Sequence, residues 1–119
     1  MKNLPKQFET YLRFVRLAAQ LESQSKIPEL DEIEKDLLNV IALHLSEDRS
    51  LLVSDVIYLK QIGSPATLHR RLSKLVTADL IRFSSDVDGR KKYIELAPKS
   101  IDYIARLGEC IAAASKTRS

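Results

Sequence analysis

The stretch that decides the fold is SPATLHRRLSKL, residues 64–75. Its apolar positions recur at the three- and four-residue spacing of one helix face, with leucines at 68, 72 and 75. Ser64 before Pro65 is typical of a helix start, because the hydroxyl caps the first turn and proline at the first position loses no needed N–H. The sequence therefore predicts an amphipathic helix with leucines inside and a small, polar and cationic face outside.

The segments around this helix predict its context. A short helix of two to three turns beginning near Ser54 and ended by Gly63 would pair with it as a helix-turn-helix. After the helix the apolar period changes from 3.6 to 2 in LIRFSSD and RKKYIEL, and DVDG between them supplies turn residues, so a β-hairpin follows as a wing. Helical spacing also predicts helices from Leu4 to Ser23, over the segment after Pro28, and from Pro98 to about Ala114.

The predicted fold class is mostly α with a small β-hairpin wing, a winged helix-turn-helix with extra N- and C-terminal helices. At 119 residues we expect a single domain. Its parts would be an N-terminal dimerisation helix (1–24), the winged helix-turn-helix core (29–97) and a C-terminal dimerisation helix (98–115). The second helix is expected to begin with Asp31 and Glu34 as a capping pair.

Charge is distributed unevenly along the chain. The net charge is +3, but residues 1–62 carry −2 and residues 63–119 carry +5. This asymmetry favours a polyanionic partner for the second half. No apolar run approaches the roughly 18 residues that span a bilayer, and the N-terminus lacks the apolar core of a signal peptide, so we expect a cytoplasmic protein with no membrane partner.

Catalytic, metal and cofactor functions lack their usual residues. The three glycines are scattered, and no nucleophile stands beside a base, so we expect no enzyme activity and no cofactor. His44 and His69 have no companion ligands at metal-binding spacing, so no metal site is expected. Cys110 is the only cysteine and lies in an apolar segment, which suits a core or interface residue.

The outer face of the helix fits the major groove of double-stranded DNA. We expect Arg70 to make a bidentate contact to guanine, whereas Arg71 leans toward the core edge and suits a phosphate or an internal carboxylate. A basic wing beside the helix would follow the backbone or enter the minor groove. The candidate residues on the helix are Ser64, Ala66, Thr67, His69, Arg70, Ser73 and Lys74, and those on the wing are Arg90, Lys91 and Lys92. A solvated basic face stays open as the alternative.

SPATLHRRLSKLVTADLIRFSSDVDGRKKYIELAPKS resembles the MarR-type winged helix-turn-helix transcription regulators, whose recognition helix S-x-x-T-h-x-R-h-L-x-x-L runs into a wing containing D-x-R. The matching positions are Ser64, Thr67, Arg70, Leu72, Leu75, Leu80, Ile81, Asp88 and Arg90. The resemblance implies sequence-specific DNA binding, with Asp88 supporting Arg90 in the wing. The chain departs from the family in Asp79 for a helix-ending glycine, in Pro98 for a threonine, and in a shorter C-terminus.

Each terminal helix has two apolar stripes, and one stripe suffices for a core. We infer a two-fold homodimer in which the second stripes pair. The predicted dimerisation residues are Phe14, Leu17, Leu21, Tyr103, Leu107 and Cys110. A helix sandwiched within its own subunit is the alternative.

Two further readings stay open. The resemblance implies a small-molecule effector, for which Tyr11, Phe14 and Tyr58 are candidate pocket residues, although aromatic packing in a core is the commoner explanation of such residues. The rival function is a winged-helix protein–protein interaction module in a larger assembly, without sequence-specific DNA binding. That module would show little salt dependence in any binding to DNA.

Overall fold

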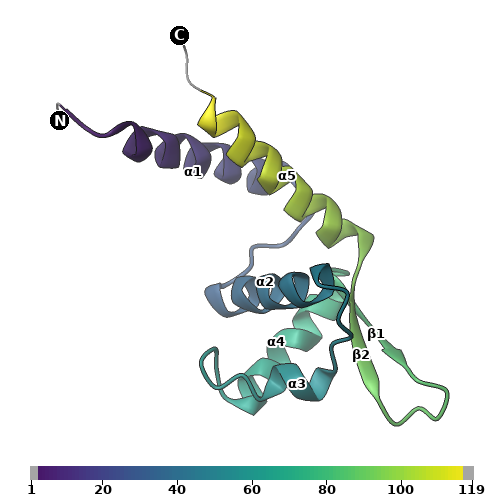
Figure 1. The fold of residues 1–119 in the computed structure, drawn as a ribbon. Helices are drawn as coiled ribbons and strands as arrows, with labels where there is room; N and C mark the ends of the chain where they lie inside the picture. Colours follow the sequence, from purple (N-terminus) through teal and green to yellow (C-terminus); the bar gives the residue numbers. More distant parts are fainter. Residues whose placement is uncertain (1–2, 117–119) are drawn as a thin grey trace. The chain divides into compact units, whose positions relative to one another are not determined.

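The computed structural model describes residues 3–116 as five helices and one hairpin (Figure 1). The elements in chain order are α1 (Lys6–Gln24), α2 (Glu32–Ser46), α3 (Val53–Ile57), α4 (Pro65–Thr77), β1 (Ile81–Ser85), β2 (Lys92–Leu96) and α5 (Pro98–Ser115). The order matches the predicted one. None of the helices within residues 3–116 has the length and apolarity to cross a membrane.

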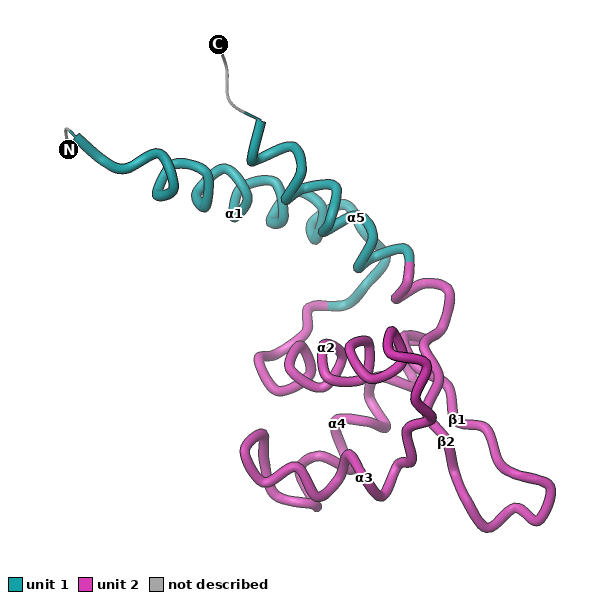
Figure 2. The backbone as a smooth tube through the Cα atoms, in the orientation of Figure 1, with its two compact units in different colours: residues 1–28, 102–119 teal, residues 29–101 magenta. Residues whose placement is uncertain are grey.

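The chain divides into two compact units (Figure 2). Residues 29–101 form unit 2, which contains α2, α3, α4, the hairpin and the start of α5. Residues 1–28 and 102–119 form unit 1, which contains α1 and most of α5. The candidate site residues of the helix and the wing therefore all belong to unit 2.

The leucine face of α4 lies in the core of unit 2. Leu68, Leu72 and Leu75 are at most 1% exposed. Their neighbours in this core come from α2, α3 and both strands, and the buried residues there include Leu37, Leu38, Ile41, Val56, Leu80, Ile81 and Ile94. Burial of each large aliphatic side chain contributes about 1.5 to 3 kcal/mol, so these residues supply most of the force that holds the elements together.

A very short extended segment, residues 51 and 52, pairs with the hairpin. β1 and β2 pair antiparallel, with Ile81 opposite Leu96 and Ser85 opposite Lys92. On the other edge of β2, the Ile94 N–H donates to the Leu51 carbonyl over 2.8 Å, and Leu52 bridges to Tyr93. Residues 51 and 52 thus pair with the free edge of β2. Since an isolated two-stranded hairpin is marginally stable in water, this third pairing supports β2 beside the Ser84–Tyr93 pair.

The helix α3 is shorter than predicted, with five residues instead of two to three turns. The chain leaves the α-helical pattern after Ile57, because the next hydrogen bonds, Leu59 N–H to the Val56 carbonyl and Ile62 N–H to the Leu59 carbonyl, span three residues. Gly63 then approaches α4 closely, where an added Cβ would lie 3.2 Å from Leu68 Cδ2. The tight turn and the glycine together let α3 and α4 meet around the leucine face.

Asp79 ends α4 with a left-handed backbone, at φ 59°. The Leu80 N–H donates to the Leu75 carbonyl over 3.0 Å and the Asp79 N–H to the Val76 carbonyl over 2.9 Å, the pattern of a Schellman cap. Aspartate adopts this conformation more readily than most residues, so it replaces the glycine expected from the family pattern. The Lys99 ammonium adds a hydrogen bond of 3.1 Å to the Ala78 carbonyl.

Hydrogen bonds of Arg13 and Tyr103 join α1 to α5 in unit 1. Arg13 donates from Nε and Nη2 to the Ala114 carbonyl near the end of α5, over 3.1 and 2.9 Å. The Tyr103 hydroxyl donates to Glu22 Oε1 over 3.3 Å. Although α1 has 19 residues, none of its side chains is fully buried. An isolated helix of this length is marginally stable, so α1 depends on what packs against its apolar side chains.

Burial, together with the adjacent Glu22 carboxylate, raises the pKa of Tyr103 from an ordinary 10.0 to about 12. Between these two pKa values the unfolded chain has lost the phenolic proton while the folded chain keeps it. The free energy of unfolding is therefore expected to fall as pH rises through this window, and to fall less in Tyr103→Phe. Urea denaturation at about pH 9 and about pH 11.5 measures the difference. Tyr58→Phe, at an exposed tyrosine, should keep the wild-type fall; an unchanged fall in Tyr103→Phe would contradict the assignment.

Candidate functional site

The outer face of α4 starts with a hydrogen-bonded row of three side chains. The Ser64 hydroxyl accepts from the Thr67 N–H over 3.3 Å and donates to Thr67 Oγ1 over 3.0 Å. Arg70 Nη2 also donates to Thr67 Oγ1, over 3.5 Å, and Arg70 is exposed to solvent. The predicted N-cap is confirmed, and the same residues that start the helix hold the guanidinium of Arg70 along its N-terminal half.

The C-terminal half of the outer face offers fewer free hydrogen-bond donors to a partner. The Ser73 hydroxyl donates to the His69 carbonyl over 3.1 Å, and the Thr77 hydroxyl donates to the Ser73 carbonyl over 3.0 Å. Both hydroxyl donors are thus used within the helix. His69 and Ala66 are exposed on the same element. Specific donors on α4 therefore concentrate near Arg70 and the first turn.

Two further cations of α4 contact the start of α2. Arg71 Nη1 lies 2.8 Å from Asp31 Oδ2 and 3.4 Å from Glu34 Oε2. Lys74 Nζ lies 3.3 Å from the same Glu34 oxygen, while the Lys74 side chain stays 65% exposed. Of the two roles considered for Arg71, the internal carboxylate is the one the structure shows. Local sequence patterns could not predict that Glu34 also contacts Lys74, because the two residues lie far apart in the chain.

The tip of the hairpin is organised by Asp86. Its Oδ1 accepts from the Arg90 N–H over 3.0 Å and from the Lys91 N–H over 3.4 Å. Its backbone carbonyl accepts from the Gly89 N–H over 3.0 Å, and Gly89 has the left-handed φ of 70° that this turn requires. Sequence reasoning did not single out Asp86 as a support, although an aspartate that bonds to backbone N–H groups ahead of it is a common turn signal.

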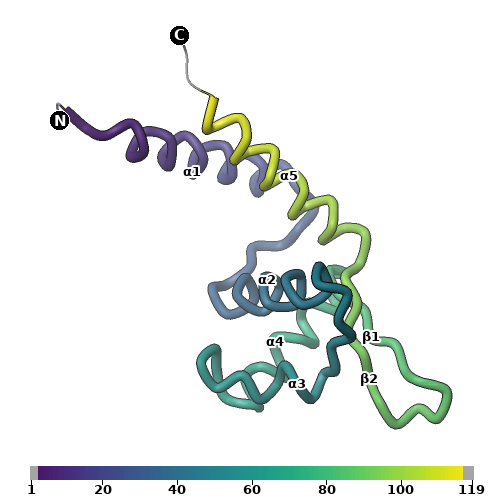
Figure 3. Tube along the Cα trace, in the orientation of Figure 1, coloured from purple at the N-terminus to yellow at the C-terminus, as the bar shows by residue number. Residues whose placement is uncertain are grey.

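The cationic side chains of the wing are exposed. Arg90 and Lys91 lie in the turn that Asp86 organises, and Lys92 is the first residue of β2. In the view of Figure 3, the first turn of α4 and the hairpin tip extend toward the same end of unit 2. The predicted helix and wing residues thus belong to one unit, and both α4 and the hairpin tip carry exposed cations. Asp88 lies at the same tip, and its support of Arg90 stays a prediction.

The exposed side chains of α4 and of the hairpin tip can form hydrogen bonds and ion pairs with a partner. Within residues 3–116, no group of three or more histidine, cysteine, aspartate or glutamate side chains is placed to hold a metal ion. Cys110 lies half-buried in α5.

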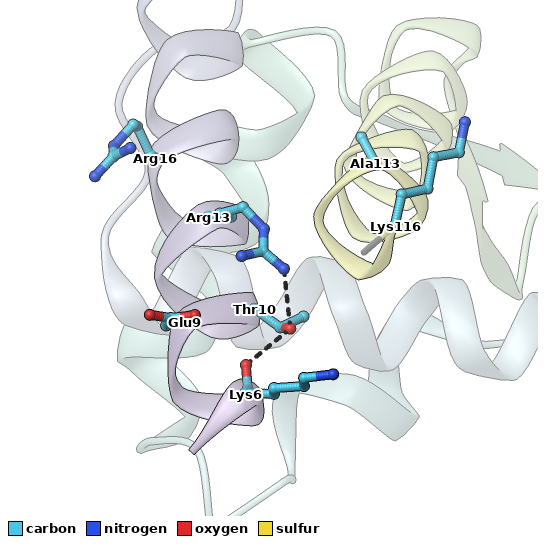
Figure 4. A pocket seen from close by; sticks show the side chains of 7 residues that line it. All are labelled: Lys6, Glu9, Thr10, Arg13, Arg16, Ala113 and Lys116. Atoms are coloured by element: carbon cyan, nitrogen blue, oxygen red, sulfur yellow. Dashed lines mark hydrogen bonds between the residues drawn. The ribbon is translucent and has the colours of Figure 1, made fainter. Parts of the chain in front are cut away.

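A second group of cations surrounds a hollow of about 650 Å³ in unit 1 (Figure 4). The hollow is lined by Lys6, Glu9, Thr10, Arg13, Arg16, Ala113 and Lys116. Figure 4 shows Arg16 directed away from α5, and Arg13 directed toward Thr10, to which its Nη2 donates over 3.2 Å. Since Arg13 is used to join α1 to the end of α5, these cations do not converge on one point in the hollow.

The predicted dimerisation residues are placed inside unit 1. Phe14, Leu17, Leu21, Leu107 and Cys110 are half-buried and Tyr103 is buried. The exposed apolar side chains of α1 belong to its other stripe, which comprises Phe8, Tyr11, Leu12 and Val15. On α5 the exposed apolar residues include Ile101 and Ile111. Both stripes of each helix are therefore apolar, as predicted, but the chain itself covers only one of them.

No family model matches the chain, and no curated protein does. Among solved structures, its fold is similar to that of a transcriptional regulator of the MarR family from Silicibacter pomeroyi, with a TM-score of 0.51 and 18% sequence identity. The match covers 92% of this chain and 66% of the other, so this chain spans slightly less than two thirds of that protein's length. The chain thus has a MarR-like winged-helix fold, and the predicted fold class is confirmed.

Asp86→Ala removes the acceptor of two wing N–H groups and is expected to speed amide hydrogen exchange at Arg90 and Lys91 about tenfold, the effect of losing one ordinary hydrogen bond. NMR-detected exchange measures it residue by residue. Asp88→Ala is the matched control at the same tip and tests the separate expectation that Asp88 supports Arg90, through the Arg90 Nε–H resonance. Equal acceleration of both amides in the two variants would contradict the role of Asp86.

Proposed function

We propose that this chain is a dimeric transcription regulator that binds double-stranded DNA in a sequence-specific manner. Helix α4 would enter the major groove, and the basic wing would lie on the phosphate backbone or in the minor groove. The observation that carries the proposal is the exposed Arg70, held by Thr67 and Ser64 at the N-terminal half of α4. In helix-turn-helix proteins this half of the second helix is the part that contacts base edges.

The roles of the side chains follow from their chemistry. Arg70 would donate two hydrogen bonds to guanine, and the small residues Ala66 and Ser73 would let the helix backbone approach the bases. Ser64, Thr67 and His69 would contribute polar contacts beside Arg70, and Lys74 a phosphate contact. On the wing, Arg90, Lys91 and Lys92 would follow a phosphate strand, with Arg90 able to enter the minor groove.

Three features support DNA as the partner over a protein. The helix and the wing carry exposed cations on one unit, and residues 63–119 hold the positive charge of the chain. The fold is shared with a protein described as a transcriptional regulator. A winged-helix protein interaction module would have no need for the Ser64–Thr67–Arg70 row on its outer face. A DNA-binding regulator works in the compartment that holds the DNA, so we propose the cytoplasm as its location.

A second copy of the chain is proposed to cover the exposed apolar stripes of unit 1. Helix α1 has no fully buried side chain, and Tyr11 is 63% exposed. Tyr11, Phe14 and Ile111 line an apolar hollow of about 390 Å³ in this unit, with the Tyr11 and Phe14 ring centres 6.5 Å apart. Large exposed apolar areas of this kind mark interaction sites. A homodimer would also present two α4 helices to a two-fold symmetric DNA site.

The dimerisation residues predicted from the sequence are kept within this proposal. They are buried or half-buried within unit 1, so a second copy would first contact the exposed stripe of Phe8, Tyr11, Leu12 and Val15. A small-molecule effector is implied only by the family resemblance, and we assign the Tyr11 and Phe14 hollow to the second copy. Tyr58, the third aromatic candidate, lies in the other unit.

Substitution at the helix and at the wing is expected to have different effects on DNA binding. Arg70→Ala should cost about 1 to 3 kcal/mol of discrimination between the preferred duplex and a scrambled one. Lys91→Ala should weaken binding to both duplexes equally and reduce the slope of log K against log salt by about 0.9. Fluorescence anisotropy with a duplex selected from a random library, at two or more salt concentrations, measures both quantities.

The wild-type protein is expected to show a salt slope of several units in the same experiment. Glu47→Gln, at an exposed residue that follows α2 and pairs with Arg49, serves as a control that alters one charge outside the predicted helix and wing residues. A wild-type slope near zero, with no preference among duplexes, would favour the protein interaction module. Unchanged discrimination in Arg70→Ala would remove Arg70 from the contact surface.

The dimer is tested by charges placed on the exposed stripe. Tyr11→Glu combined with Ile111→Glu should shift the sedimenting species from twice 13.5 kDa to 13.5 kDa, because two buried carboxylates per chain would each lose their water without a partner. Leu43→Glu is the matched control, since Leu43 is also 63% exposed but lies on α2 in unit 2. Analytical ultracentrifugation that finds both variants dimeric would place the interface elsewhere.

A further inference from the structure

Glu34 is a buried carboxylate at the start of α2, 2% exposed to solvent. Its Oε1 accepts from the Asp31 N–H over 2.9 Å, while the Asp31 carboxylate accepts from the Glu34 N–H over 2.8 Å. This reciprocal pair is the capping box that the sequence predicted. The other oxygen of Glu34, Oε2, faces α4.

Glu34 Oε2 contacts two cations of α4 at once. Arg71 Nη1 lies 3.4 Å from it and Lys74 Nζ lies 3.3 Å from it. A carboxylate taken out of water is tolerated only when its charge is compensated, so both contacts are needed where Glu34 is buried. Replacing a whole buried ion pair by apolar residues often costs little stability, whereas removing one partner is destabilising, and in some proteins such groups fix one arrangement among alternatives.

The two cations differ in what else they contact. Arg71 has a second partner in Asp31, with Nη1 to Oδ2 at 2.8 Å, and faces the core edge. Lys74 has Glu34 as its ion-pair partner, and its side chain is mostly exposed. An ammonium group has three N–H donors, so Lys74 can keep its contact with Glu34 and offer the remaining donors to a phosphate. The position of that ammonium group is then set by α2.

We propose that Glu34 is a positioning residue of the DNA interface. Through Lys74 and Arg71 it holds α4 in one rotation against α2, so that Arg70 on the outer face meets one base pair and Lys74 one phosphate. This inference rests on the proposed function. Its consequence is specific: Glu34 contributes to discrimination between sequences, whereas its negative charge opposes the overall attraction to DNA.

Glu34→Gln is the direct test, because glutamine keeps an oxygen for the Asp31 N–H and loses the charge that holds the two cations. The ratio of affinities for the selected and the scrambled duplex is expected to fall about tenfold, the worth of a hydrogen bond to a charged group. Affinity for the scrambled duplex should stay the same or rise, since the chain gains one positive charge. A general loss of structure would lower both affinities, so the two readouts separate positioning from folding.

Glu32→Gln is the matched control for charge. Glu32 lies in the same first turn of α2, is exposed, and makes the same change in net charge. It should leave the affinity ratio at the wild-type value. Equal ratios in Glu34→Gln and Glu32→Gln would overturn the inference.

Lys74→Met completes the test and does not depend on the stability of a variant at a buried site. It should weaken binding to both duplexes through the lost phosphate contact, and it should also lower the ratio, because α4 loses its contact with Glu34. Glu34→Gln added to Lys74→Met should lower the ratio less than Glu34→Gln does in the wild type, because the two residues act through one contact. If Glu34→Gln does not fold, an unchanged ratio in Lys74→Met is sufficient to overturn the inference. A wild-type protein that binds both duplexes equally would instead overturn the proposed function, and this inference with it.

Discussion

Burial of the leucine face of α4 is the constraint on which the rest of the structure depends. With Leu68, Leu72 and Leu75 fixed in the core of unit 2, the opposite face of a 3.6-residue helix must face solvent. Arg70 is exposed for that reason and Arg71 reaches the carboxylates of α2 from the edge of the core. The turn at Gly63 and the Schellman cap at Asp79 set where this helix begins and ends. Packing of the leucine face thus determines which side chains of α4 are exposed to solvent.

Sequence periodicity was sufficient to predict the order of the elements, because each element has its own apolar spacing. It was also sufficient for the caps at Ser64 and Asp31, whose partners lie three residues away. It overestimated the length of α3, since the tight turns after Ile57 depend on how closely Gly63 must approach Leu68. Local patterns carry no information on such approaches.

The candidate site shows the same division between local and distant contacts. The exposure of Arg70 and the internal pairing of Arg71 follow from their angles around a helix axis. The contact of Lys74 with Glu34 joins residues 40 positions apart and could not be seen in either segment alone. The wing contains two aspartates, Asp86 and Asp88. Only the three-dimensional structure shows that Asp86 is the one that accepts hydrogen bonds from the Arg90 and Lys91 N–H groups. Which of two apolar stripes on α1 stays exposed was likewise a question of three-dimensional packing.

The short bridge between Leu52 and Tyr93 has a mechanical consequence for the hairpin. It supports β2 at Tyr93, one pair before the last strand pair, Ser85 with Lys92, so little more than the turn lies beyond the support. The paired length of β2 is therefore stiffened almost to its end, and compliance is confined to the turn of residues 86–91. Motion of that turn would leave the strands and the leucines beneath α4 in their places.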